Sequence, residues 1–230
     1  MYHLRCNMQA KIEKVNPKKP SKQVLKHAAR LIRKGAVIVC PTDTGYALAA
    51  NALDTKAIVK VFNLKGRAYS NPIHVAVSSL EMAERYARIS PEAERLAHSF
   101  LPGALTLVLP KKEVVPSLLV AGYDTVGIRI PDHKVMLDLA AMTELPITAT
   151  SANVSGQPTP YSVPEVINLL GGAMEQVALI LDQGPILSRG LSTIVDLTVS
   201  PPQLLRQGLV SWLEIRQVLQ ALQDSASEQE

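Results

Sequence analysis

The stretch AVIVC (36–40) followed directly by PTDTGY (41–46) decides the fold class of this chain. The first run is short, apolar and rich in β-branched residues, which is typical of a buried strand. The second run is polar and turn-rich, and it predicts a loop where that strand ends. Ligand sites in open α/β sheets form in the crevices at strand ends. We therefore expect a buried strand that leads into a functional loop.

Further strands and helices are predicted on both sides of this stretch. Short apolar runs predict strands at 73–77, 104–109, 125–130, 146–150, 177–182, 192–197 and 203–207. Helical spacing and capping residues predict helices between Ser21 and Gly35 and at 55–63, 79–87, 91–99, 132–142, 163–170 and 211–222. The two types are mixed rather than strictly alternating, and no linker divides the chain. The pattern predicts a single α/β domain over residues 21–222 with one mixed sheet and flanking helices.

Composition excludes several classes of protein. The chain has 230 residues, and its 47% hydrophobic content is too high for a mainly disordered protein. No apolar run is long enough to span a membrane, and the N-terminus lacks the apolar core of a secretory signal. The two cysteines, Cys6 and Cys40, have neither metal-ligand spacing nor the context of a disulfide framework. The sequence indicates a globular protein of the cytoplasm that makes no use of a membrane.

Positive charge is concentrated at the front of the chain. Residues 1–34 hold ten Lys/Arg and one acid, whereas residues 35–230 hold fourteen Lys/Arg and nineteen acids. We expect residues 1–20 to form a flexible basic leader and residues 223–230 a polar tail. The leader could attract RNA phosphates weakly through counterion release. A solubilising tail with a solvated helix face is the simpler interpretation, because the segment lacks interleaved aromatic residues that stack on bases.

Familiar catalytic motifs are missing from the sequence. It contains no G-x-x-x-x-G-K-[ST], no G-x-G-x-x-G after a strand, no H-E-x-x-H and no G-x-S-x-G. The five histidines show no metal spacing. A P-loop ATPase, a Rossmann dehydrogenase, a zinc hydrolase and an α/β-hydrolase are therefore all disfavoured.

Cationic and hydroxyl side chains gather instead where predicted strands end. The cations are Lys65, Arg67, Arg129 and Arg206, and the hydroxyls are those of Thr42, Thr44, Ser151, Ser192 and Thr193. The set has no close carboxylate pair and no cysteine nucleophile, which suits a polyanion held for phosphoryl or nucleotidyl transfer. Each cation taken alone is as readily a surface charge, and Asn153 and Ser155 taken alone are as readily turn residues.

Eight segments, in this order, resemble the YrdC/TsaC family of threonylcarbamoyl-adenylate synthases. They are PTDTGYALA (41–49), LKGRAYSNPI (64–73), LPGALTLVL (101–109), VGIRIPDH (126–133), ITATSANVSG (147–156), LDQGP (181–185), LSTIVDL (191–197) and LLRQG (204–208). The resemblance covers roughly residues 21–212 and is to the short form, which lacks the extra C-terminal domain. It implies a YrdC-like fold, a twisted sheet with a central concave and positively charged cavity.

The resemblance also implies an activity. Members of the family are nucleotidyltransferases that join L-threonine, bicarbonate or carbon dioxide, and ATP into threonylcarbamoyl-adenylate, and they release pyrophosphate. The intermediate supplies the threonylcarbamoyl group of an adenosine next to the anticodon in tRNA, and tRNA threonylcarbamoyltransferase machinery makes the final transfer. Mg²⁺ is expected to arrive with ATP and to have no protein ligands.

Site residues are carried over from the matching motifs. Lys65 and Arg67 match the K-x-R pattern and are expected to be catalytic and to hold the ATP phosphates. Further ATP-binding residues are expected at Asn71, Thr125, Ser151, Asn153, Thr159 and Arg206. Threonine-binding residues are expected at Thr44, at Arg129 for the carboxylate, at the backbone of Ala149 and at Ser192.

The sequence also departs from the family pattern. Gly45 stands where an apolar residue is usual, and Ala47 and Ala49 replace glycines, which is expected to narrow the pocket. The histidine of N-P-L-x-V-H is displaced, because His74 directly follows Ile73 and Ala76 stands in the usual place. Two alternatives stay open: a related enzyme with the same cavity and another acceptor substrate, and a non-catalytic RNA-binding module.

Overall fold

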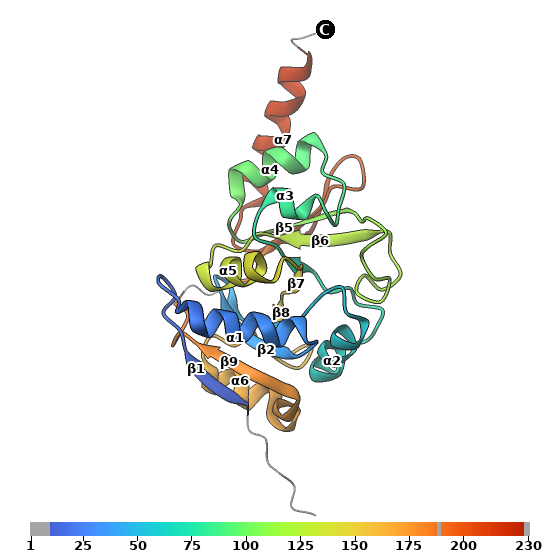
Figure 1. The fold of residues 1–230 in the computed structure, drawn as a ribbon. Helices are drawn as coiled ribbons and strands as arrows, with labels where there is room; N and C mark the ends of the chain where they lie inside the picture. Colours follow the sequence, from blue (N-terminus) through green and yellow to red (C-terminus); the bar gives the residue numbers. More distant parts are fainter. Residues whose placement is uncertain (1–9, 188–189, 228–230) are drawn as a thin grey trace, which may run out of the picture.

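Two mixed β-sheets form the centre of the molecule. The computed structural model describes residues 10–187 and 190–227 (Figure 1). The first sheet has the order β1 (Lys11–Lys14), β9 (Val177–Asp182), β2 (Val37–Thr42), β3 (Gly45–Ala49), β8 (Thr150–Ser151). The second has the order β11 (Gln203–Arg206), β10 (Thr193–Asp196), β5 (Leu105–Pro110), β6 (Thr125–Arg129), β4 (Val75–Ala76), β7 (Ile147–Thr148). The mixed α/β class is confirmed, although the strands divide between two sheets rather than forming one.

Helices cover both sheets and begin near the predicted caps. They are α1 (Lys22–Arg33), α2 (Thr55–Lys65), α3 (Leu80–Ala83), α4 (Pro91–Phe100), α5 (Lys134–Thr143), α6 (Val163–Leu170) with a 3₁₀ turn at Gly171–Gln176, and α7 (Trp212–Ser227). Asp54 caps α2 by accepting from the amides of Lys56 and Ala57, and Gly66 ends that helix in a left-handed conformation. α2 therefore delivers Lys65 and Arg67 to a fixed place beside the sheets.

The predicted loop PTDTGY is in fact a tight hairpin. β2 continues through Pro41 to Thr42, and β3 begins at Gly45, so only Asp43 and Thr44 form the turn. The Thr42 hydroxyl closes this turn by donating to the Gly45 carbonyl at 2.7 Å. β9 pairs with β2 only as far as Val39. Pro41 lies beyond this pairing, so its lack of a backbone N–H costs the sheet no hydrogen bond. The hairpin holds the functional turn more rigidly than a loop would.

The predicted leader is partly wrong. Residues 1–9 lie outside the described part of the chain, but Lys11–Lys14 forms β1, which pairs parallel with β9 from Leu179 to Asp182. Val15 is buried, and its amide donates to the Asp182 carbonyl at 2.8 Å. Strand pairing uses backbone groups, so the charged sequence KIEK serves as an edge strand. The leader prediction fails from residue 11 onward.

The C-terminal helix is longer than expected. The prediction ended it at residue 222, whereas α7 runs to Ser227, so the first part of the predicted tail 223–230 is helical. Residues 228–230 lie outside the described residues. α7 packs against α4 beside the second sheet (Figure 1). No helix within residues 10–187 and 190–227 has both the length and the apolar character needed to cross a membrane.

Candidate active site

A cavity between the two sheets collects most of the predicted site residues. The predicted residues that line it are Thr44, Arg67, Arg129, Ala149, Ser151, Thr159, Ser192 and Arg206. Its other lining residues are Thr42, Gly45, Tyr46, Ala47, His74, Pro131, Thr150 and Leu191. Hydroxyls and guanidinium groups from both sheets therefore face one space, and none of these lining residues is acidic.

Arg129 anchors one end of the cavity. It is the last residue of β6 and is only 6% exposed. Its Nε donates to the Gly103 carbonyl at 2.8 Å, Nη1 to the Thr44 hydroxyl at 2.6 Å, and Nη2 to Asp43 Oδ2 at 2.6 Å. Burial lowers the pKa of Arg129 and the Asp43 carboxylate opposes this effect, so the guanidinium stays charged. A guanidinium has five N–H donors, so two remain for a ligand.

Arg206 forms the facing wall together with Ser192. Arg206 ends β11, and its Nε and Nη2 donate to the Ser192 carbonyl at 3.0 and 2.8 Å. Nη2 also donates to the Ser192 hydroxyl at 2.9 Å, which lies 2.9 Å from the hydroxyl of Thr106. Burial and the charge of Arg129 both lower the pKa of Arg206, in that order. Two guanidinium groups therefore act on the same cavity, which favours an anionic ligand.

Arg67 contributes the third guanidinium. It follows α2, and its Nε and Nη2 donate to the carbonyls of Asn71 and Pro72 at 3.1 and 2.9 Å. These two bonds hold the side chain at the cavity edge and leave Nη1 free to bind a ligand. Asn71 is exposed and supplies its carbonyl to Arg67, but it does not line the cavity.

Lys65 lies beneath the cavity rather than in its lining. The side chain is almost wholly buried, and its Nζ donates to the carbonyls of Ser151 and Asn153 at 2.7 and 3.0 Å and to Asn153 Oδ1 at 2.9 Å. Burial, followed by the charge of Arg67, lowers the pKa of Lys65 to about 7. The three acceptors around Nζ hold the amino group in this position. Lys65 thus fixes the 151–153 loop, and its contact with phosphates stays a prediction.

Asn153 and Thr125 are also outside the cavity lining. Asn153 is buried, and its amide donates to the Pro158 carbonyl at 2.8 Å while its Oδ1 accepts from Ser151 Oγ at 2.6 Å. It therefore holds both ends of the loop that carries Thr159. Thr125 begins β6, about 13 Å along the strand from Arg129. Thr193, a sequence candidate, is buried in β10 and donates to the Val210 carbonyl at 2.6 Å.

His74 is a cavity residue that the family pattern marks as displaced. Residues 74 and 76 share a face of an extended segment, so His74 points to the side where the family histidine is expected. Burial and then the charges of Arg206, Arg67, Arg129 and Lys65 lower the pKa of His74 to about 3. The imidazole is therefore neutral at physiological pH and can donate one hydrogen bond without a charge. Alternate residues of an extended strand face the same side, and this alternation in the sequence was the signal that could have identified His74 as a site residue.

Gly45 is required by the shape of the hairpin. Its φ is +132°, and a Cβ there would lie 2.5 Å from Thr159 Cγ2 and 3.1 Å from the Pro160 carbonyl oxygen. We expect Gly45→Ala to lower the free energy of unfolding by about 1–3 kcal/mol. Urea unfolding measures this change against Gly172→Ala, where an added methyl meets no atom within 4 Å. Equal stability of the two variants would contradict the close approach.

Comparisons with known proteins identify the family of this chain. Residues 30–208 match the profile of the Sua5/YciO/YrdC family, which is described as telomere recombination. A threonylcarbamoyl-AMP synthase of Pyrococcus abyssi is 45% identical over 193 residues, which is 84% of this chain and 56% of that protein. A threonylcarbamoyl-AMP synthase of Bacillus subtilis is 39% identical over 84% of this chain and 55% of its own length. The chain thus spans about half the length of these curated relatives.

Solved structures show the same fold. Sua5 of P. abyssi, crystallised with L-threonine, superposes with a TM-score of 0.84 at 42% identity over 90% of this chain and 60% of that chain. YciO of Escherichia coli superposes with a TM-score of 0.79 at 27% identity over 88% of this chain and 97% of its own. The family profile, the relatives and the fold all cover the segments that build the cavity, and the chain belongs to the Sua5/YciO/YrdC family.

Proposed function

We propose that the chain synthesises L-threonylcarbamoyladenylate from L-threonine, bicarbonate or carbon dioxide, and ATP, and releases pyrophosphate. The observation that carries this proposal is the arrangement of Arg67, Arg129 and Arg206 around one cavity whose lining has no carboxylate. The names of the relatives from P. abyssi and B. subtilis support the same reaction. Three cations are a suitable set for holding an amino acid carboxylate beside a triphosphate.

Threonine would bind at Arg129. The two donors of Arg129 that remain free lie on Nη1 and Nη2, which suits a bidentate pair with a carboxylate. The Thr44 and Ser192 hydroxyls and the backbone of Ala149 line the same space and would contact the rest of the amino acid. The complex of P. abyssi Sua5 with L-threonine supports an amino acid ligand in this fold.

ATP would bind toward Arg67 and Arg206, with Ser151 and Thr159 on the adjacent loop. Lys65 supports that loop from below, and Asn153 ties it together. The cavity holds about 140 Å³, whereas pockets for drug-sized ligands have about 300–1,000 Å³. We therefore expect the lining to open when the nucleotide enters and to close on both substrates.

The reaction needs positioning more than it needs a protein base. The neutral amine of threonine attacks the carbon of carbon dioxide and loses a proton to solvent water, which gives a carbamate. A carbamate oxygen then attacks the α-phosphorus, and the bond to the bridging oxygen of the β-phosphate breaks. Arg67 and Arg206 would offset the charge that builds on pyrophosphate. Holding two mutually repelling anions in place can supply about 7–11 kcal/mol of the barrier reduction.

Magnesium would enter with the nucleotide. The lining residues include no carboxylate, and no cluster of three or more His, Cys, Asp or Glu able to hold a metal occurs in the described part of the chain. Mg²⁺ is commonly bound through substrate phosphates. The residues present do not form a protein ligand set for the ion, and no step above depends on it.

The product would be used in the cytoplasm by tRNA threonylcarbamoyltransferase machinery. A mixed anhydride of a carbamate and AMP is an activated group that must pass to a nucleophile. We therefore propose that a partner enzyme consumes the intermediate on tRNA, with any RNA binding by this chain supporting that transfer.

A related enzyme with another acceptor is the second candidate. Gly45 and Ala47 line the cavity where the family pattern has other residues, and His74 enters from a shifted position. These three residues line the cavity in which the amino acid would bind, so they would alter the choice of amino acid rather than of nucleotide. The same reaction type and the same nucleotide contacts would remain.

Pyrophosphate release with ATP and bicarbonate separates these candidates. We expect release to rise at least about tenfold when threonine is added, because the carbamate of threonine is the nucleophile. Serine, alanine and a reaction without amino acid are the controls. Isothermal titration should also show that ATP binds more tightly with threonine present. Greater release with another amino acid would favour the related enzyme, and RNA binding without any release would favour the non-catalytic module.

A further inference from the structure

His74 lines the cavity between the sheets at the point where β4 begins. Ala76 of β4 pairs with Arg129 of β6 in parallel register, so His74 lies beside Gly127. A Cβ added to Gly127 would be 2.9 Å from the Cβ of His74, which agrees with this register. Residues 127 and 129 face the same side of β6, because side chains alternate along a strand. Gly127 therefore leaves room for the imidazole on the cavity side of the sheet.

This position lies between the parts of the cavity that would hold the two larger substrates. On one side, Arg129, proposed for the carboxylate of threonine, is about 7 Å further along β6 than Gly127. On the other side, Arg67, proposed for ATP, donates to the carbonyl of Pro72 at 2.9 Å, just before His74 in the chain. The carbon of the carbamate must lie between the amine of threonine and the α-phosphorus. The one-carbon substrate must therefore bind between these two ends, where His74 lies.

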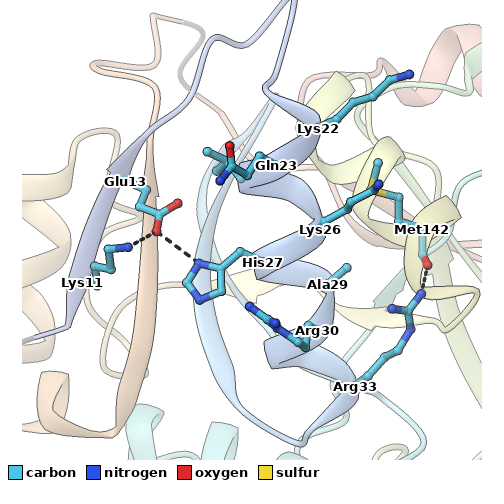
Figure 2. A pocket seen from close by; sticks show the side chains of 11 residues that line it. Lys11, Glu13, Lys22, Gln23, Lys26, His27, Ala29, Arg30, Arg33 and Met142 are labelled. Atoms are coloured by element: carbon cyan, nitrogen blue, oxygen red, sulfur yellow. Dashed lines mark hydrogen bonds and ion pairs between the residues drawn. The ribbon is translucent and has the colours of Figure 1, made fainter.

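Both ring nitrogens of His74 are open to a ligand. Two other histidines have fixed partners, since His27 Nδ1 lies 3.1 Å from Glu13 Oε1 (Figure 2) and His133 Nε2 lies 2.6 Å from Gln183 Oε1. The ring of His74 has no hydrogen bond to any residue within 10–187 and 190–227, although it lines the cavity. Polar groups that are largely buried are almost always hydrogen-bonded, to protein, water or ligand. The open nitrogens therefore mark a place where a bound molecule is held.

The imidazole is a hydrogen-bond donor without a charge. Burial, and then the positive charges of Arg206, Arg67, Arg129 and Lys65, hold the pKa of His74 at about 3. A neutral imidazole donates from one nitrogen and accepts at the other. A hydrogen bond from a cation is stronger and would hold back an oxygen that has to attack, whereas a neutral donor orients it with less loss of electron density. The cations would thus attract the anion, and the imidazole would fix its direction.

We propose that His74 donates a hydrogen bond to bicarbonate, and to the carbamate made from it, in a third subsite between Arg129 and Arg67. The inference rests on the proposed function, which requires this substrate and assigns no residue to it. Bicarbonate takes up a solvent proton and releases water as it becomes carbon dioxide, the amine adds to the carbon, and the proton that the amine loses goes to solvent. One carbamate oxygen then accepts from His74 while the other attacks the α-phosphorus. The imidazole keeps its proton throughout.

The first test varies bicarbonate, with the full chain in buffers freed of carbon dioxide, and measures pyrophosphate release. His74→Ala is expected to raise the KM for bicarbonate at least about tenfold and to change the KM for threonine and for ATP less than about twofold. His74→Asn and His74→Gln place an amide N–H near one or the other ring nitrogen, and one of them is expected to restore the KM for bicarbonate to within about threefold. The control His98→Ala removes an exposed imidazole of α4 and should leave all three constants unchanged.

The second test measures binding without turnover, from the line width of carbon-13 bicarbonate in the presence of protein and threonine. The unchanged protein and His98→Ala should broaden the line equally, and His74→Ala at most about a third as much. Broadening that depends on His74 without pyrophosphate release from the unchanged protein would refute the proposed reaction and support the subsite. Threonine-dependent release combined with an unchanged KM for bicarbonate in His74→Ala would refute the subsite alone.

Further results would also overturn the proposal. Equal rises of all three KM values in His74→Ala would show a general distortion of the cavity, and a rise for ATP alone would place His74 on a phosphate. A fall in kcat with an unchanged KM for bicarbonate would show that the imidazole does not hold this substrate. Failure of both amide variants to restore the KM would show that His74 acts by its shape and not as a donor. Equal broadening of the bicarbonate line by His74→Ala and the unchanged protein would exclude the contact directly.

Discussion

Arg129→Lys is expected to lower kcat/KM for threonine by about 10²–10³. Arginine offers two parallel N–H groups to a carboxylate, whereas lysine offers a single point charge on a flexible stem. The same change removes the bonds that Arg129 makes to Thr44, to Gly103 and to Asp43. Steady-state pyrophosphate release with threonine varied would show the loss mainly as a higher KM for threonine.

The matched control is Arg85→Lys, because Arg85 is exposed and lies outside the cavity. It is expected to leave both substrate constants unchanged. The KM for ATP separates the assigned role from general damage. A loss of folded protein would lower kcat and leave both KM values unchanged, whereas loss of the carboxylate contact would raise the KM for threonine alone. Unchanged threonine use in Arg129→Lys would remove Arg129 from the carboxylate site.

Lys65→Met is expected to lower kcat/KM for ATP by about 10²–10³ and the free energy of unfolding by about 1–3 kcal/mol. Methionine keeps the length of the side chain but leaves the Ser151 and Asn153 oxygens without their donor. The loop that carries Ser151 would then lose its support, and the cationic charge near the phosphates would disappear. Lys60→Met is the matched control, because Lys60 also lies on α2 and donates to a carbonyl, that of Gly35, away from the cavity.

The role of Lys65 can be separated from folding by two measurements. The KM for ATP does not depend on the amount of active enzyme, so a loss of folded protein alone would leave it unchanged. Proton uptake is the second measurement, because the pKa of Lys65 is lowered to about 7 in the free protein and phosphates would raise it again. At about pH 8, ATP binding should therefore take up close to about one proton, and at about pH 6 much less. Calorimetric titration of ATP in buffers of different ionisation enthalpy measures this proton uptake. The same uptake by the Lys65→Met variant would contradict the assignment to Lys65.

The sequence predicted the helices and strands well where local patterns decide them. The predicted helix 55–63 corresponds to α2, which runs two residues further to Lys65, and the predicted strand 177–182 corresponds to β9. The division into two sheets was missed because strand pairing joins segments far apart in the chain, such as β1 with β9. The charged sequence KIEK gave no apolar signal, because its strand is held by backbone bonds to Leu179 and its neighbours.

Residue type and position indicated which cations share the cavity, whereas their contacts with substrates stay predictions. Arg67, Arg129 and Arg206 share a cavity, as their positions at strand and helix ends suggested. Sequence reasoning could not place Lys65, because burial beneath the Ser151 loop depends on the tertiary packing of α2. Contacts of substrates with Lys65, Asn71, Thr125 and Asn153 stay predictions, since these residues do not line the cavity of the free protein.

The walls of the cavity come from widely separated parts of the chain, from Thr42 to Arg206. A polypeptide emerging from the ribosome gains the hairpin turn early, but it acquires the facing guanidinium only when β11 has been translated. Fragments that end between Arg129 and Arg206 would have the first guanidinium but not the second. The nascent chain therefore completes the walls of this cavity only after most of its residues have been synthesised.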